Sequence, residues 1–183
     1  MSTETATSTK TYTIDPAHST ARFWVRHLMV SKVHGTIDDI TGTVSFDEGT
    51  PASAKVDVSL NVASLSTGQE QRDGHLKSAD FFDIEKFPAI TFVSTGITAQ
   101  GNNEYDVVGD LTIHGTTHSI TLRAEASEEV PNPYGGFKIG VSATGVINRD
   151  DFGVSYNQAL EAGGVMIGKE VHLTIDAELD RPA

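Results

Sequence analysis

Apolar and polar side chains alternate with a period of two along most of the chain, as in a β-strand with one buried and one exposed face. Residues 55–62 follow this pattern without interruption, and residues 171–180 repeat it. Two further segments, 119–126 and 137–147, obey the same rule. These segments predict antiparallel strands that each present a single apolar face.

Less regular segments add further strands. Alternating apolar positions occur at Tyr12 and Ile14; at Ala21, Phe23 and Val25; at Ile40, Val44 and Phe46; at Ile90 and Phe92; and at Tyr105, Val107, Leu111 and Ile113. Turn sequences separate the segments at 48–51, 100–103, 114–117 and 131–136. The chain is therefore expected to form about nine or ten strands.

The length of these strands bears on the architecture. Several exceed the usual length of about 5–6 residues, and long strands with one apolar face fit a closed, tilted barrel better than a sandwich of short strands. Closure also removes unpaired sheet edges. We therefore expect an all-β fold, an antiparallel lipocalin-like β-barrel of about eight or more strands that can enclose a small ligand. A β-sandwich is the alternative on pattern alone.

One segment after residue 66 departs from the alternation and is expected to form a short α-helix between strands. Thr67 and Glu70 have the spacing of a capping box, with Thr67 as the N-cap. Asp73 and Lys77 are expected to support each other across one helical turn. Pro88 prevents the helix from continuing into the next strand.

Apolar residues in and after this helix indicate its role. Leu76 is its strong apolar anchor, and Phe81 and Phe82 follow shortly after it. We expect the helix to close one end of the barrel. Arg72 and His75 would tie it to strand ends or meet the polar head group of a ligand.

Length and composition fit one globular domain. The chain has 183 residues, of which 38% are hydrophobic and 21% are charged. Residues 1–10 are rich in Ser and Thr and are expected to be a disordered tail, followed by a single domain over 11–183. Cysteine is absent and no signal peptide is recognisable, so a cytoplasmic protein is expected.

The net charge argues against two classes of partner. Thirteen Lys and Arg residues stand against 25 Asp and Glu residues, which gives a formal charge of −12. A nucleic-acid-binding protein needs a basic footprint, and an anionic membrane surface repels an acidic protein, so neither nucleic-acid binding nor standing adsorption to such a membrane is expected. No apolar run approaches the roughly 18 residues of a spanning helix, so stable membrane insertion is not expected either.

Seven histidines are candidates for metal binding or catalysis, but they lack the spacing of known metal sites. His27 shares the parity of Phe23 and Val25, so we expect it to face the interior and to bond to backbone or to a ligand head group. Four others are expected to be solvated surface residues: His34, His114, His118 and His172. Nucleophile-elbow and nucleotide-binding motifs are absent, so no catalytic residue or metal is predicted.

The long mixed segment 148–164 has two interpretations. It is either a packed connection in which Arg149 bonds to a carboxylate, or a lid over the barrel mouth lined by Phe152, Tyr156 and Leu160. The two interpretations have equal support from the sequence.

The chain also resembles a known family along nearly its whole length. The matching segments are DPAHSTARFWVRH (15–27), VHGTIDDITGTVSFD (33–47), VASLSTGQEQRDGHLKSADFFDIEKFPAITF (62–92), GDLTIHGTTHSITL (109–122), INRDDFGV (147–154) and GKEVHLTIDAEL (168–179). In their order and spacing they resemble the YceI-like family of polyisoprenoid-binding, lipocalin-like proteins.

This resemblance implies a barrel whose hydrophobic lumen holds an amphiphile with a polyprenyl chain, either quinone-like or a polyprenyl phosphate. Members of the family are often dimers, so the resemblance also suggests a homodimer. Many members of the family are periplasmic. Small inward residues would widen the lumen: Ala21, Gly35, Gly42, Ala124 and Ala143. We expect a protein that stores, sequesters or transports this lipid. The alternatives are an enzyme that acts on the lipid through His27 or Arg149, and a ligand-free stress-response protein with a packed barrel.

The residues expected to contact the lipid come from the inward faces of the strands, from the helical segment and from the 148–164 segment. They are Phe23, Val25, His27, Val44, Phe46, Val58, Leu60, Leu76, Phe81, Phe82, Phe92, Ile139, Val141, Arg149, Phe152 and Tyr156. Apart from the bound lipid, no cofactor is predicted.

Overall fold

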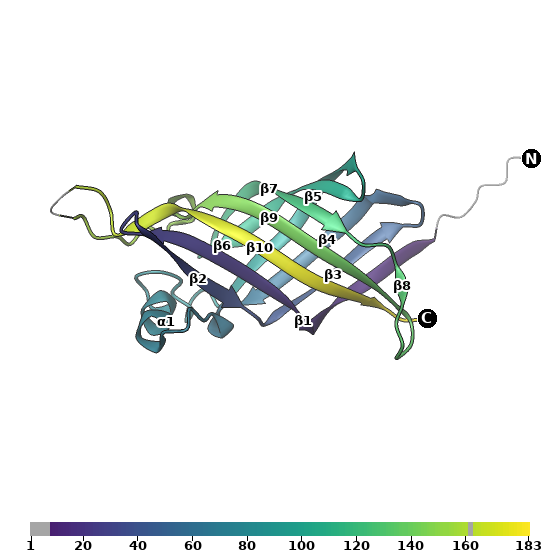
Figure 1. Cartoon of the computed structure of the whole chain (residues 1–183), viewed down its shortest axis with the longest axis horizontal. Coiled ribbons are helices and arrows are strands. Elements are labelled where there is room, and N and C mark those ends of the chain that lie inside the picture. Colours follow the sequence, from purple (N-terminus) through teal and green to yellow (C-terminus); the bar gives the residue numbers. More distant parts are fainter. Residues whose placement is uncertain (1–7, 161–162) are drawn as a thin grey trace, which may run out of the picture.

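The computed structural model describes residues 8–160 and 163–183, which form a closed antiparallel β-barrel (Figure 1). Eight strands follow one another around the ring in the order β10-β1-β3-β4-β5-β6-β7-β9, and β9 pairs with β10 to close it. They are β1 (Thr9–His27), β3 (Ile40–Asp47), β4 (Thr50–Asn61), β5 (Ala89–Gly101), β6 (Glu104–Ile113), β7 (Thr116–Ala126), β9 (Phe137–Asn148) and β10 (Ile167–Arg181). The expected barrel is confirmed, and the sandwich alternative is wrong.

Two strands lie beside the ring. The first, β2 (Ser31–Ile37), pairs with β1, and the second, β8 (Val130–Pro131), pairs with β9. Residues 9–13 of β1 pair with β3 and residues 21–27 pair with β2, while β10 runs along both halves. The register with β10 shifts between Asp15 and Thr20, where Pro16 has no amide hydrogen to donate. One long strand thereby serves both ends of the barrel.

The inward side chains form two apolar clusters along the barrel. One contains Phe81 and Phe152 and lies toward the end that carries the helix, and the other contains Tyr12 and Leu179. Tyr12 is completely buried and stacks on Phe46, with 5.5 Å between the ring centroids. Alternation of inward and outward side chains thus produces a continuous apolar interior.

Two of the small residues expected to widen the lumen accommodate a neighbour instead. A Cβ atom on Gly35 would lie 2.4 Å from the ring of Phe23, its partner across the β1–β2 pair. A Cβ atom on Gly42 would lie 2.3 Å from the carbonyl oxygen of Asp57 on the adjacent strand. Both glycines therefore permit a close approach. The other three residues line the lumen as expected: Ala21, Ala124 and Ala143.

The expected helix is present as α1 (Glu70–Lys77), but its N-terminal cap differs from the prediction. Gln69 is the N-cap, and its side chain accepts a hydrogen bond from the backbone N–H of Arg72. Asp73 accepts hydrogen bonds from the backbone N–H and the hydroxyl of Thr67. Because the helix begins at Glu70 and its N-cap is Gln69, Thr67 lies before the cap, and the predicted capping box is wrong.

Charged side chains of α1 bond within their own segment. Asp73 turns back to Thr67 and forms no ion pair with Lys77 within the described residues. Arg72 donates to the hydroxyl and the carbonyl oxygen of Thr67, and His75 bonds to the Asp80 carboxylate at 2.8 Å. The expected ties from Arg72 and His75 to strand ends are wrong, because both find partners nearby in sequence.

The helix lies at one end of the barrel, as expected (Figure 1). Two 3-10 helices, η1 (Val62–Ser64) and η2 (Arg149–Phe152), belong to the connections at this end. Among the described residues, no helix has the length and apolar composition needed to cross a bilayer. The strand β1 already includes Thr9 and Lys10, so it begins inside the expected tail, and residues 1–7 lie outside the described part.

Candidate functional site: the barrel lumen

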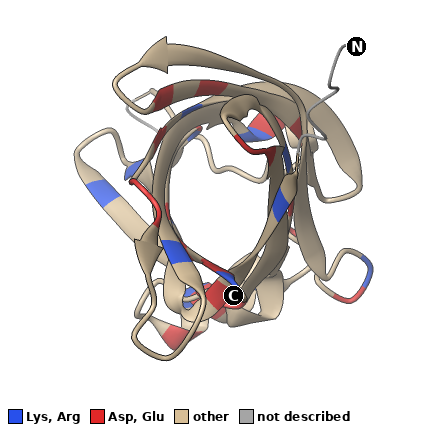
Figure 2. Ribbon diagram, turned by 90° about the vertical axis from the view of Figure 1, so that its right-hand side faces the viewer, with Lys and Arg blue, Asp and Glu red and all other residues tan. Residues whose placement is uncertain are grey.

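An apolar cavity of about 490 Å³ occupies the lumen. Its volume falls within the range of about 300–1000 Å³ that is typical of small-molecule sites. Figure 2 looks along the barrel from the end that carries the C-terminus, and the strands form a ring around this space. All eight ring strands and the α1 segment contribute side chains to the wall.

All but two of the residues expected to contact a ligand lie on the cavity wall. They are Phe23, Val25, Val44, Phe46, Val58, Leu60, Leu76, Phe81, Phe82, Phe92, Ile139, Val141, Arg149 and Phe152. The exceptions are His27 and Tyr156, which lie outside the wall.

His27 does not face the lumen, and the expectation of an interior histidine is wrong. His27 is the last residue of β1, and it lies off the cavity wall although its pairing with β2 continues in register from Val25. His27 is partly exposed and pairs with Ser31 in the β1–β2 hairpin. An enzymatic interpretation loses one of its two candidate residues.

Arg149 lies on the wall, and it bonds to carbonyl oxygens rather than to the expected carboxylate. Its Nε atom donates to Gly168 at 2.9 Å, and its Nη1 atom donates to Val154 at 2.5 Å and to Tyr156 at 3.0 Å. The residue is 6% exposed, and this burial lowers the pKa of its guanidinium. Its donors hold the chain after η2 against the start of β10, so this cation shapes the end of the lumen.

The aromatic residues after η2 join this connection to the α1 segment. Tyr156 lies 5.0 Å from the rings of both His75 and Phe81, measured between centroids. Phe152 is 1% exposed and packs against His118. The observed contacts favour the packed connection over the lid. Leu160 lies off the wall, and residues 161–162 of the expected lid lie outside the described part.

Three of the four histidines expected to be solvated have specific partners. His118 bonds to the carbonyl oxygen of Asp151 at 2.9 Å, His114 packs on Phe87, and His172 stacks on Trp24 with 3.6 Å between centroids. His34 is exposed, as expected. Alternation along a strand predicts on which side of the sheet a side chain lies, but it does not predict which residues pack against it there.

At the end opposite α1, the wall carries a polar group that the sequence did not reveal. Glu129 accepts hydrogen bonds from the hydroxyl of Tyr12, from Arg181 at 3.0 Å and from Lys10 at 3.2 Å. The Tyr12 hydroxyl, followed by Arg181 and Lys10, lowers the pKa of the Glu129 carboxyl to about 2. Tyr12 has inward parity with Ile14 and was recognisable, whereas Glu129 is 117 residues from Tyr12 and gave no local signal.

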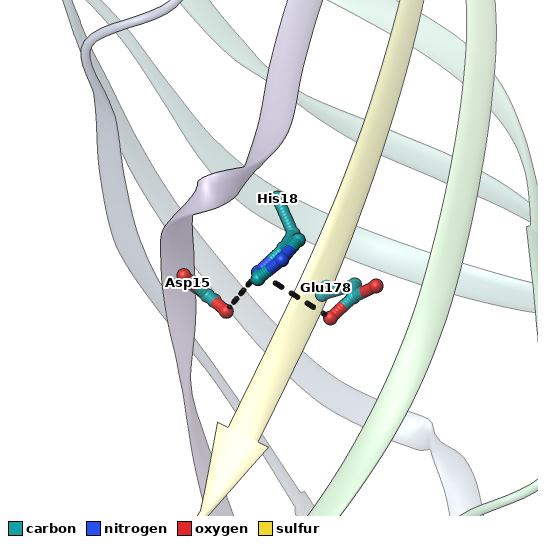
Figure 3. A group of neighbouring side chains, drawn as sticks. All are labelled: Asp15, His18 and Glu178. Carbon is teal, nitrogen blue, oxygen red and sulfur yellow. Dashed lines mark hydrogen bonds and ion pairs between the residues drawn. The ribbon is translucent and has the colours of Figure 1, made fainter.

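A cluster with metal-like composition lies on the outer surface. His18 Nδ1 is 2.7 Å from Asp15 and 3.9 Å from Glu178 (Figure 3). The ammonium of Lys138 contacts the same two carboxylates at 3.1 and 2.8 Å. The hydrogen bond from His18, followed by that from Lys138, lowers the pKa of Asp15 to about 2. A cation of the chain itself therefore neutralises this group.

Comparison with known proteins places this barrel among related structures. The fold matches BcnA of Burkholderia cenocepacia with a TM-score of 0.79 at 22% identity, covering 90% of this chain and 98% of that one. It matches the YCEI protein of Campylobacter jejuni with a TM-score of 0.72 at 30% identity, covering 86% and 90%. A polyisoprenoid binding domain from Saccharophagus degradans matches with a TM-score of 0.68 at 16% identity, covering 93% and 98%. The first and third show likeness of fold alone.

Sequence comparison identifies the family. A UPF0312 protein of Staphylococcus aureus strain MSSA476 is 43% identical over 168 residues, which cover 91% of this chain and 95% of that protein. The model of the YceI-like domain matches residues 12–179. The chain therefore belongs to the YceI-like family.

Proposed function

We propose that the protein binds an amphiphilic polyisoprenoid lipid, quinone-like or a polyprenyl phosphate, in the barrel lumen and stores, sequesters or transports it. The observation that carries the proposal is a cavity of about 490 Å³ whose wall is built from aliphatic and aromatic side chains. The family of the chain and the structural likeness to a polyisoprenoid binding domain support the same class of ligand.

The energetics of an apolar chain in this lumen favour a carrier. Each CH₂ group removed from water contributes about 0.8 kcal/mol, so a chain of about forty carbons would gain roughly 30 kcal/mol against water. Non-covalent affinities saturate near 18–21 kcal/mol, so water is not the relevant reference. The lipid leaves a bilayer that already shelters it, and the two environments are nearly balanced. A near balance allows release as well as uptake.

The alternatives have less support. A ligand-free protein with a packed barrel would have a lumen filled by side chains, whereas a cavity is observed. An enzyme would need polar groups that converge beside the ligand. Arg149 directs its donors at carbonyl oxygens and His27 lies off the wall, so the two residues named for this role do not converge.

Extraction of the purified protein with organic solvent, followed by mass spectrometry, tests the proposal. We expect a polyisoprenoid that is depleted in extracts of Val141→Gln, which places an amide on the apolar wall. The matched control is Ser142→Gln, because Ser142 is the next residue and is exposed. Repeated recovery of no isoprenoid, or equal recovery from both variants, would contradict the proposal.

A further inference from the structure

The turn between β1 and β2 exposes three consecutive apolar side chains at the end of the barrel that carries α1 (Figure 1). Leu28, Met29 and Val30 are 41%, 62% and 81% exposed. Single exposed apolar residues are common, but three in succession at the tip of a hairpin form an apolar projection.

The backbone of this turn is unfavourable for the residues that it contains. Leu28 and Met29 have φ angles of 50° and 59°, and the N–H of Val30 donates to His27 at 3.0 Å to close the turn. Bulky residues rarely adopt this left-handed conformation, which suits Asn and Gly. The shorter turn between β5 and β6 also has two positive φ angles, and it places Asn102 and Asn103 there. The chain thus uses the favoured residues in one hairpin and apolar residues in the other.

The positive charges beside the tip also lie in an arrangement that costs electrostatic free energy. Arg26 lies directly opposite Lys32 in the β1–β2 pair, and like charges in that position repel. Both cations lie over the ring of Trp24, Lys32 at 3.9 Å and Arg26 at 5.9 Å from its centroid. Residues 16–37 contain no Asp or Glu, although the chain has 25 of them. The nearest acidic residue along β10 is Glu170, and neither cation pairs with it within 4 Å among the described residues.

We propose that this hairpin docks reversibly on the surface of an anionic phospholipid bilayer. Insertion of Leu28, Met29 and Val30 would remove their exposed apolar surface from water, and anionic head groups would relieve the repulsion between Arg26 and Lys32. A tryptophan flanked by cations suits the interfacial layer just behind an inserted tip. The net charge of −12 repels the rest of the molecule from such a surface, so the hairpin sets the orientation.

Docking in this orientation brings the α1 end of the barrel to the bilayer (Figure 1). The inference goes beyond lipid binding in the lumen and can be tested without an isoprenoid. Vesicles of phosphatidylglycerol and phosphatidylcholine, and vesicles of phosphatidylcholine alone, are the probes in a flotation assay. We expect binding to the anionic vesicles, weakened by added salt, and much weaker binding to the neutral ones.

Two sets of substitutions separate the apolar tip from the charges. The triple variant Leu28→Asn, Met29→Gly and Val30→Thr gives the turn favoured residues, so it should fold well and bind anionic vesicles about tenfold or more weakly. The pair Arg26→Gln and Lys32→Gln should weaken binding about fivefold for each cation removed.

The control is Tyr134→Ser, because Tyr134 is 98% exposed in the turn between β8 and β9 at the opposite end of the barrel. This variant should bind vesicles as the unmodified protein does. Absence of binding to anionic vesicles would overturn the proposal, as would equal binding by the triple variant or a loss with Tyr134→Ser. Because these vesicles contain no isoprenoid, each of these results leaves the extraction test of the lumen unaffected.

Discussion

At the scale of single residues, Arg149 shows how one buried cation can organise the end of a lumen. Its guanidinium links η2, the chain that follows it and the start of β10 through carbonyl oxygens. Carbonyl groups that lose their donor in a buried position are costly, because water cannot replace it. The residue therefore supports the shape of the wall, and replacing it should chiefly lower the free energy of unfolding.

Arg149→Met should lower the free energy of unfolding by about 3 kcal/mol, because it leaves several buried carbonyl oxygens without a donor. Urea denaturation measures the change. The control is Lys169→Met, which removes an exposed ion pair to Asp150 and should cost less than about 1 kcal/mol. Equal stability of the two variants would show that the carbonyl contacts of Arg149 contribute little.

Glu129 makes the stability of the barrel depend on pH in the acidic range. Its pKa is about 2 in the folded protein and 4.5 ordinarily, so its stabilising contribution is complete above about pH 4.5 and is lost as the pH falls toward 2. The side chain is 24% exposed, and with allowance for screening by solvent the contribution is about 2 kcal/mol.

Thermal unfolding of Glu129→Gln across this pH window tests the assignment. The variant should lose part of the pH dependence of the unmodified protein between pH 4.5 and 2. Glu128→Gln is the matched control, because Glu128 is the preceding residue and accepts a hydrogen bond from Asn103. Parallel curves for the Glu129 variant and the unmodified protein would be inconsistent with the role described.

At the scale of elements, α1 contributes little buried apolar surface to the lumen wall. None of its residues is buried, and Leu76 is its contribution to the wall. Elements with little buried apolar area open at low free energy, so this helix is the region expected to move when a ligand passes. Hydrogen exchange should be faster in α1 than in the strands of the ring.

Gly74→Ala should stabilise α1 and slow the release of a bound lipid. Glycine inside a helix costs about 0.5–1 kcal/mol relative to alanine, and an added Cβ atom at Gly74 meets nothing within 4 Å. The control is Gly96→Ala in β5, where a Cβ atom also meets open space. Slower exchange of α1 amides without slower lipid release would show that the helix does not gate the lumen.

Elements also mark the limit of what the sequence predicted. The strands and the apolar wall were predictable, because alternation along a strand reports burial on one face locally. The position of His27 off the wall was not predictable, because alternation does not show where the end of a strand passes beyond the lumen. The cap of α1 was missed because the helix begins at Glu70, three residues after Thr67, with Gln69 as its N-cap. The Glu129 group likewise depends on partners that only the fold brings together.

At the scale of the whole molecule, the barrel is a container whose contents should contribute to its stability. A ligand that binds only the folded state stabilises it by about 3 kcal/mol when present at a hundred times its dissociation constant. For a chain of this length, that corresponds to a rise in the unfolding temperature of about 5–10 °C.

Calorimetry before and after removal of the lipid with detergent measures this effect. The unfolding temperature should fall on removal and return when the extracted lipid is added back. An unchanged unfolding temperature, with removal verified by mass spectrometry, would show that the lumen contents do not stabilise the barrel.

Closure of the ring by β1 and β10 has a consequence for biosynthesis. This pairing joins Thr13 to Asp180, so the barrel cannot be completed until almost the entire described chain has been made. Until then, the strands from β1 to β9 can form only an open sheet with two unpaired edges and an unsealed apolar face. Contacts between such distant residues form slowly, and sheets in this condition are prone to aggregate. The topology that seals the lumen therefore makes the nascent chain dependent on rapid arrival of its last strand.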